Sequence, residues 1–192
     1  MPNLPQKGAR TRVFRNQVRD NNTANFAAPG GAVAGVPAGS GIVINSNDAV
    51  EIFDNDLSDN DTAHIIISSV FSTNYAARET AAGFDPYPET IFIHDNRYGP
   101  GGGSPDTLEL KALKLAMFGL TGSFPHVIWD GFMNEEKAID GGMAPELNFC
   151  IANEPETELL NVDGPGGYGN PSVEKAAFDC RHAALPPVVL VL

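Results

Sequence analysis

Residues 50–60 read VEIFDNDLSDN, and this stretch decides how the chain is expected to fold. Apolar and polar side chains alternate over its first half, which is the pattern of a β-strand with one face in the core. Asp and Asn dominate its second half and indicate a tight turn. Similar stretches occur as TRVFRNQVRDNN at residues 11–22 and as TIFIHDNRYG at residues 90–99. A pattern that occurs three times suggests a repeat architecture.

The three stretches align on Asn16, Asn55 and Asn96. Three residues before each asparagine lies an apolar residue that we expect to point into one common interior: Val13, Ile52 and Ile93. Asn tolerates left-handed backbone geometry and its amide hydrogen-bonds locally, so each Asn is expected at a bend. Stacked repeats would place these amides in a column with a spacing of about 4.8 Å.

Two further stretches, GIVI at residues 41–44 and HIII at residues 64–67, are expected to form a second stack of strands. The chain is therefore predicted to be all-β, a right-handed parallel β-helix of about three coils. The alternative is three unrelated strands of an antiparallel sandwich. The asparagines are about 40 residues apart, whereas a bare coil needs about 20 to 25. Long loop insertions are therefore expected at residues 23–40 and 71–89.

The pattern divides the chain into three parts. Residues 1–9 form an N-terminal extension, residues 10–99 the coils, and residues 100–192 an irregular capping region with short strands. A helix is predicted from Ser104 to Phe118, because Ser followed by Pro is a good helix start and Gly119 a good stop. The short N-terminal extension leaves the first coil uncovered, so missing coils, a second copy or another chain is expected to cover it.

Composition narrows the possible partners and compartments. The 192 residues carry a net charge of −12, so nucleic acid is not an expected partner, because phosphate binding needs clustered Lys and Arg. No stretch of about 18 apolar residues is present, so no membrane span is expected. Cys150 and Cys180 fit no metal motif, and they are interpreted either as two buried thiols or as a disulfide.

The stretches GIVINSNDAVEIFDND, RTRVFRNQVRDNN and ETIFIHDNR resemble the repeats of right-handed parallel β-helix proteins, over residues 10–98. The runs FIHDNRYGPGGGSPD, LKALKLAMFG and NVDGPGGYGNPSV resemble a narrower proteobacterial group of exported β-helix proteins of unsettled function. Members of that group are longer, with further coils at the start. The resemblance implies the C-terminal part of a longer family member or an unusually short one, in the periplasm or outside the cell.

Candidate site residues lie in the outward columns of the aligned strands: Arg15, Asp54 and Asp95 in one, and Phe14, Phe53 and His94 in the other. Carboxylates of Asp54 and Asp95 on adjacent coils suit glycoside hydrolysis or, with Asp56, a calcium ion. Phe53 offers a face for a sugar ring. In the simpler interpretation, Arg15 pairs with Asp54, His94 lies near Asp95, and the column is a solvated face.

The sequence contains no recognisable catalytic constellation. We therefore expect an exported β-helix module that binds carbohydrate or has a structural or assembly role, with a glycan as the expected partner and calcium as the one cofactor considered. The alternative is a polysaccharide-modifying enzyme, a hydrolase, lyase or epimerase, that uses the outward Asp column.

Overall fold

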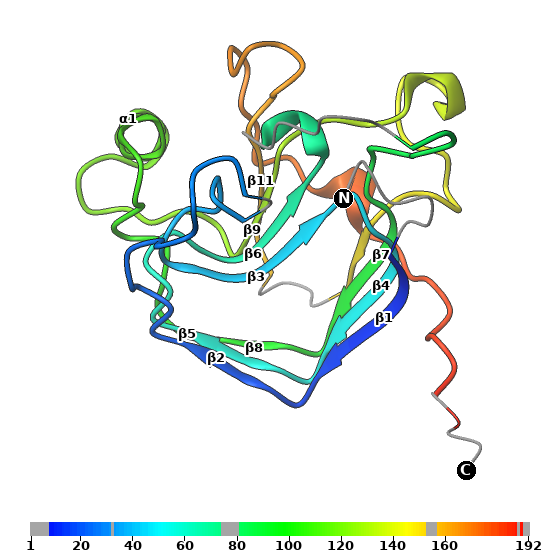
Figure 1. The fold of residues 1–192 in the computed structure, drawn as a ribbon, viewed down its shortest axis with the longest axis horizontal. Coiled ribbons are helices and arrows are strands. Elements are labelled where there is room, and N and C mark those ends of the chain that lie inside the picture. The colour runs from blue at the N-terminus through cyan, green and yellow to red at the C-terminus, as the bar shows by residue number, and fades with distance from the viewer. Residues whose placement is uncertain (1–7, 32, 74–80, 153–156, 188, 190–192) are drawn as a thin grey trace.

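The computed structural model describes residues 8–31, 33–73, 81–152, 157–187 and 189 (Figure 1). Three parallel sheets dominate it. The first, here sheet A, contains β1 (Ala9–Phe14), β4 (Asp48–Phe53), β7 (Glu89–His94) and β10 (Cys150–Ile151). Sheet B contains β2 (Gln17–Arg19), β5 (Asp56–Ser58) and β8 (Arg97–Tyr98). Sheet C contains β3 (Ser40–Asn45), β6 (Ala63–Ser68), β9 (Val127–Trp129) and β11 (Leu159–Asn161).

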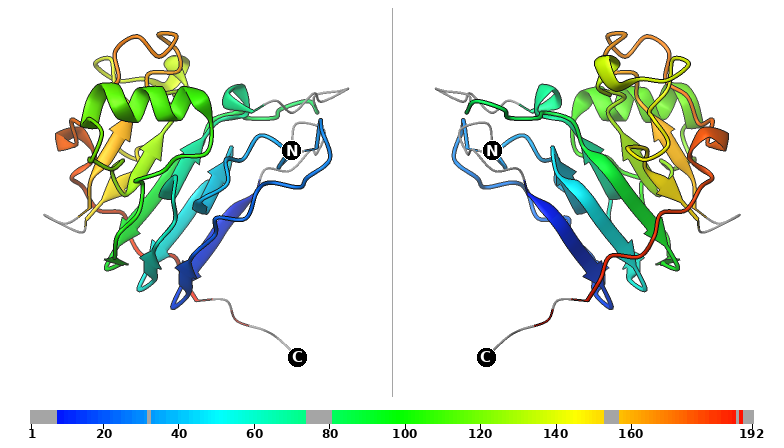
Figure 2. Two further views of the ribbon diagram at one scale, coloured as in Figure 1. Left: turned by 90° about the vertical axis from the view of Figure 1, so that its left-hand side faces the viewer. Right: turned by 90° about the vertical axis from the view of Figure 1, so that its right-hand side faces the viewer.

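The chain passes through the sheets in turn, so that strands distant in sequence stack side by side (Figure 2). Parallel pairing joins Val13 to Ile52 and Ile52 to Ile93, as the alignment of the three stretches predicts. The predicted second stack is also confirmed, because β3 pairs with β6 with Ile42 opposite Ile65. All pairs between these strands are parallel, which rules out the antiparallel sandwich.

Sheets A, B and C surround a common interior (Figure 1), and each contributes side chains to one apolar core. Ile52 from sheet A, Leu57 from sheet B and Ile65 from sheet C are each at most 1% exposed and belong to the same cluster. Alternate residues of each strand point inward, because successive side chains of a strand lie on opposite faces. The core therefore uses one face of each of the three sheets.

A ladder of asparagine side chains stacks at the corner between sheets A and B. Asn16 Nδ2 donates to Asn55 Oδ1 and Asn55 Nδ2 donates to Asn96 Oδ1, each at 2.9 Å. The residues in the left-handed backbone region at this corner are those just before the asparagines, with positive φ at Arg15, Asp54 and Asp95. The asparagines stack at a bend as predicted, but the residue before each of them takes the left-handed conformation, and the Asn amide bonds the stack.

A second, shorter ladder forms at the next corner along the chain. Asn21 Nδ2 donates to Asn60 Oδ1 at 2.8 Å, and Asn60 Nδ2 donates to the carbonyl of Val18 at 2.9 Å. His64 completes this corner: its Nε2 lies 3.0 Å from the carbonyl oxygen of Gly99, and its Nδ1 lies 3.2 Å from Asn60 Nδ2. The carbonyl only accepts, so Nε2 carries a proton, and the Asn60 amide nitrogen only donates, so Nδ1 accepts and the imidazole is neutral.

The single α-helix among the described residues, α1, spans Leu108–Phe118 rather than beginning at Ser104. Thr107 is its N-cap, with the side chain accepting from the N–H of Leu110, and Gly119 ends it. The helix starts late because the segment before it is bonded to a neighbouring turn: Ser104 N–H donates to the Asp61 carbonyl, and Asp106 N–H donates to the Thr62 hydroxyl.

Helix α1 covers the outer face of sheet C and not the open end of the stack, where it was expected (Figures 1 and 2). Its side chains Leu110, Leu113 and Met117 pack with Ile128 and Leu160, which point outward from β9 and β11. The C-terminal end of the core is covered instead by aromatic side chains. The ring of Phe178, in the 3-10 helix η3 (Ala176–Phe178), stacks on Phe149 at 4.5 Å and meets Trp129 edge-on.

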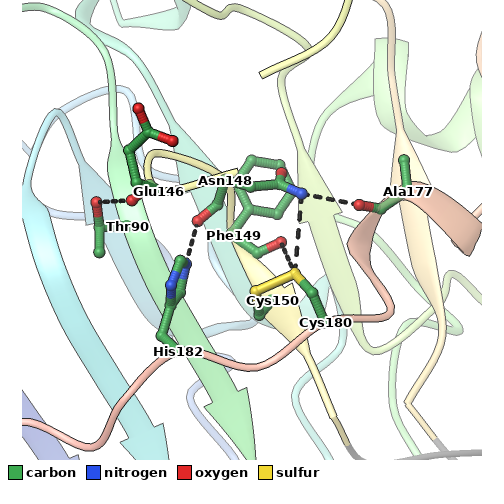
Figure 3. The surroundings of a disulfide bond; sticks show 8 residues. All are labelled: Thr90, Glu146, Asn148, Phe149, Cys150, Ala177, Cys180 and His182. Atoms are coloured by element: carbon green, nitrogen blue, oxygen red, sulfur yellow. Dashed lines mark hydrogen bonds between the residues drawn. A yellow bond between two sulfur atoms is a disulfide. The ribbon is translucent and has the colours of Figure 1, made fainter. Parts of the chain in front are cut away.

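The sequence pattern places coils only as far as Gly99, but the parallel sheets continue beyond it. Strand β9 extends sheet C and strand β10 extends sheet A. A disulfide joins Cys150 in β10 to Cys180 just after η3 (Figure 3). Of the two interpretations of the cysteines, the disulfide is confirmed. It fastens the C-terminal segment to the last strand of sheet A, and His182 Nε2 adds a contact to the Asn148 carbonyl at 2.6 Å.

Strands β1, β2 and β3 lie at the ends of their sheets within the described part of the chain. Their inward side chains Val13, Val18 and Ile42 are only partly buried against the core. Within the same residues, none of the helices has the length and hydropathy that a membrane crossing requires.

Candidate functional site

The connections that leave sheet C meet at one edge of the molecule. Strand β6 leads into the 3-10 helix η1 (Val70–Ser72), strand β9 leads into residues 130–149, and β11 leads into the loop of residues 162–171. The strands are neighbours and parallel, so their carboxyl ends lie together, and these connections rise side by side (Figure 1).

The connections form an open cleft of about 800 Å³. Three aromatic rings line it, from Phe71 in η1, Tyr87 and Phe132, with the Phe71 ring centroid 5.7 Å from Tyr87 and 5.2 Å from Phe132. Phe71 is 53% exposed, although a large apolar side chain is normally buried. A cluster of rings open to solvent in a concave surface is a feature of binding sites.

One buried carboxylate holds two of these rings in place. Asp130, 6% exposed, follows β9 directly. Its Oδ2 accepts from the N–H and hydroxyl of Ser69 and from the hydroxyl of Ser72, at 2.6, 2.8 and 2.7 Å. Its Oδ1 accepts from the N–H of Phe132 at 3.2 Å. Asp130 therefore fixes η1, which carries Phe71, relative to the backbone of Phe132.

The rim of the cleft is acidic. Glu135 and Glu136, both exposed, lie on the 3-10 helix η2 (Glu135–Lys137), and Asp163 lies on the loop after β11. None of the described residues that line the cleft is Lys, Arg or His. Burial raises the pKa of the Tyr87 phenol, and the charges of Glu135, Asp85 and Glu136 raise it further. The cleft thus combines apolar faces with negative potential.

A second group of carboxylates lies beside the cleft. Ligand atoms of Asp48, Asp85 and Glu89 lie within 4.8 Å of one another, close enough to hold a metal ion. Lys137 Nζ lies among them, 3.1 Å from Asp85 and 2.9 Å from Glu89. Burial disfavours the Lys137 charge, but the hydrogen bonds to Glu89 and Asp85 outweigh it and raise its pKa. The lysine therefore already supplies positive charge at this point.

The predicted column of Arg15, Asp54 and Asp95 forms at the corner between β4 and β5. This corner lies on the opposite side of the fold from the connections that follow β6, β9 and β11 (Figure 1). Each carboxylate has a partner: Asp54 lies 3.1 Å from Arg15 Nε, and Asp95 lies 2.7 Å from His94 Nδ1. Asp56, the third residue considered for calcium, makes a double hydrogen bond with Arg97 at 2.6 and 2.9 Å. This hydrogen bond lowers the pKa of Asp56.

The aromatic column also forms as predicted. The ring of Phe53 stacks between Phe14 and His94, with centroids 5.0 and 5.2 Å apart. Part of this face is covered, because the C-terminal segment crosses it. Glu51, 2% exposed, accepts from Arg12 Nε at 2.9 Å and from the N–H of Leu185 at 3.2 Å, and it lies 3.2 Å from His94 Nε2. The pairs of Asp54 with Arg15 and of Asp95 with His94 correspond to the simpler interpretation of the column.

The repeat pattern of the sequence does not indicate the cleft. Phe71 and Tyr87 lie in one predicted insertion, but Asp130, Phe132 and Asp163 follow β9 and β11, which the repeat pattern did not indicate. The sequence does contain the two strands, as the short, mostly apolar runs Val127–Trp129 and Leu159–Asn161. Asp130 follows the first directly, and Asp163 follows the second after one residue. Runs of three residues are too short for periodicity to identify them as strands.

Comparison with protein families, curated proteins and solved structures gave no match to this chain. Its fold and site are therefore interpreted from their own geometry.

Proposed function

We propose that the protein is a carbohydrate-binding module built on a right-handed parallel β-helix, and that the sugar binds in the cleft of Phe71, Tyr87 and Phe132. The order in which the chain visits sheets A, B and C and the two asparagine ladders support the β-helix. The observation that carries the function is the set of three rings in one open cleft. Sugar rings present apolar C–H faces that lie against aromatic rings, and acidic side chains accept hydrogen bonds from hydroxyl groups.

The disulfide supports an exported protein, because disulfides persist mainly in oxidising compartments. The resemblance of the repeats to those of exported proteobacterial β-helix proteins supports the same proposal.

A calcium ion at Asp54, Asp56 and Asp95 stays a prediction, which calorimetry with CaCl₂ tests directly. Enzymatic modification of a polysaccharide by the Asp54 and Asp95 column is the alternative function, and release of reducing ends from a polysaccharide would indicate it.

The test of binding is calorimetry against a panel of oligosaccharides with three variants. Phe71→Ala removes the most exposed ring and is expected to weaken binding at least tenfold, about 1.4 kcal/mol. Phe26→Ala is the matched control, since Phe26 is 94% exposed and does not line the cleft. The double variant Asp54→Asn, Asp95→Asn tests the column as the site. Loss of binding in the double variant alone would move the site to the column.

A structural or assembly role is a second candidate, favoured by the edges of β1, β2 and β3. Edge strands present unpaired backbone groups that pair readily with another strand. The inward side chains of Val13 in β1 and Val18 in β2 are only partly buried. Further coils, a second copy or another chain would cover these edges. Light scattering at micromolar concentration tests this role for the 192-residue chain. A stable monomer with β1 protected from hydrogen exchange would argue against it.

A further inference from the structure

We infer that the cleft selects a positively charged sugar chain, an oligosaccharide of amino sugars with free ammonium groups. This inference rests on the proposed carbohydrate function and names the class of ligand. It follows from two features that coincide in the cleft, the acidic rim and the exposed ring faces.

The rim sets the sign of the charge. Glu135, Glu136 and Asp163 line the cleft, and its lining among the described residues contains no basic side chain. The nearest cation on the same element, Lys137, is held by Asp85 and Glu89 at 3.1 and 2.9 Å. Its charge is therefore compensated outside the cleft. An ammonium group gains from this field, whereas a uronic acid is repelled by it.

The rings favour the same charge. The face of an aromatic ring is the negative side of its quadrupole, so an ammonium group above it is attracted, most strongly where water is partly excluded. Phe71 and Phe132 lie with centroids 5.2 Å apart at a tilt of 42°, and Tyr87 lies 56° from the plane of Phe71. Rings at these tilts present their faces in different directions along the lining of the cleft.

The roles of the acidic residues differ, which makes the rim testable. Asp163 also shapes its loop, because its carboxylate accepts from the N–H groups of Gly166 and Asn170. Glu135 and Glu136 are exposed, and no hydrogen bond to either carboxylate is needed to form η2, which Asn134 caps. Glu135→Gln with Glu136→Gln therefore removes two charges and leaves the surface shape nearly unchanged.

The experiment compares three tetrasaccharides by calorimetry: the tetramer of glucosamine, its N-acetylated neutral counterpart, and the tetramer of galacturonic acid. The wild-type chain is expected to bind the glucosamine tetramer at least tenfold tighter than the acetylated one, and the galacturonate tetramer most weakly. The preference should shrink as salt is raised, because exposed charges are screened. In the Glu135→Gln, Glu136→Gln variant the preference should fall to about threefold or less, with affinity for the acetylated tetramer unchanged.

Two controls identify the reason for a failure. Glu109→Gln with Glu146→Gln removes the same two charges at exposed residues outside the cleft, and it should keep the preference. If the preference survives in the Glu135→Gln, Glu136→Gln variant, the net charge of the protein causes it and the inference is wrong. Equal affinity for the first two tetramers overturns the inference but leaves the proposed function. Absence of binding to every tetramer overturns the inference. Absence of binding to the whole oligosaccharide panel, or binding that Phe71→Ala does not weaken, overturns both.

Discussion

The Asp130 carboxylate accepts hydrogen bonds from both the backbone N–H and the hydroxyl of Ser69, at 2.6 and 2.8 Å. The two residues are 61 positions apart in sequence, and each directly follows a strand of sheet C, Ser69 after β6 and Asp130 after β9. Parallel pairing of β6 and β9 brings them together. A contact at the end of two strands thereby positions the loops that carry the rings of the cleft.

Replacing Asp130 by Asn is expected to weaken ligand binding at least tenfold and to lower stability by about 2 kcal/mol. The carboxylate of Asp130 accepts from N–H and hydroxyl donors, and the Asn amide would turn an NH₂ group toward some of them. Hydrogen bonds to a buried charged group are worth about 1.5–3 kcal/mol. Ser72→Ala removes one of the four hydrogen bonds and should have a smaller effect on both. Calorimetry and urea unfolding measure the two quantities. Full affinity in the Asp130→Asn variant would show that the loops hold the rings without this carboxylate.

Replacing Asn55 by Ala should cost about 2–3 kcal/mol of unfolding free energy. The side chain of Asn55 is fully buried, and it bonds to Asn16, Asn96 and the carbonyl of Val13. Its loss leaves buried polar groups without partners, at about 1–3 kcal/mol for each such group. Asn16→Ala is the matched control at the exposed end of the same ladder, and about 1 kcal/mol or less is expected there. If urea unfolding gave the same loss of free energy for both variants, burial would not determine the contribution of an Asn to the ladder.

Stability is expected to decrease as the pH falls below about 6.5, in part because of His64. Burial lowers the pKa of His64, and the charge of nearby His126 lowers it further, while the Gly99 carbonyl and Asp59 act in the opposite direction. In the unfolded chain the imidazole titrates near pH 6.5. Between that value and the lower folded pKa, only the unfolded state binds the proton, so stability is complete above pH 6.5 and is lost toward the folded pKa.

The slope from one such group is at most about 1.4 kcal/mol per pH unit. His64→Gln should lower stability at pH 7.5 and flatten the dependence between pH 6.5 and 5, measured as urea midpoints. His182→Gln is the control, because His182 lies away from the corner that Asn60 and His64 form. An unchanged slope in the His64→Gln variant would show that other groups cause the acid sensitivity.

Reduction of the Cys150–Cys180 disulfide should release the C-terminal segment before the strands unfold. The bridge closes a loop over a separation of 30 residues, which corresponds to about 3.6 kcal/mol of stabilisation in the chain-entropy description. Limited trypsin digestion is expected to cleave after Arg181 soon after reduction, with Arg97 in β8 and Lys114 in α1 protected. A Cys150→Ser, Cys180→Ser variant should show the same pattern without reductant. If cleavage is equally slow in the oxidised and reduced proteins, the contacts of Phe178 and His182 hold the segment by themselves.

The sequence by itself determined the repeat and the register of the strands. Val13, Ile52 and Ile93 alternate with polar neighbours and precede an Asn at a fixed distance, and such local regularity specifies which face is buried and which residues pair. The outward stack of Phe14, Phe53 and His94 follows from the same register. Which residue makes the bend was not determined, because Asp and Asn both tolerate the left-handed region, and the structure places Asp54 there.

Only the tertiary structure decided where the cleft lies. Phe71, Phe132 and Asp163 come from three separate connections, and nothing in their local sequence relates them until β6, β9 and β11 pair side by side. The start of α1 was decided in the same way, since Ser104 is a good cap but its backbone bonds to Asp61 on a distant turn. Local propensities amount to about 1 kcal/mol, so contacts between distant segments override them.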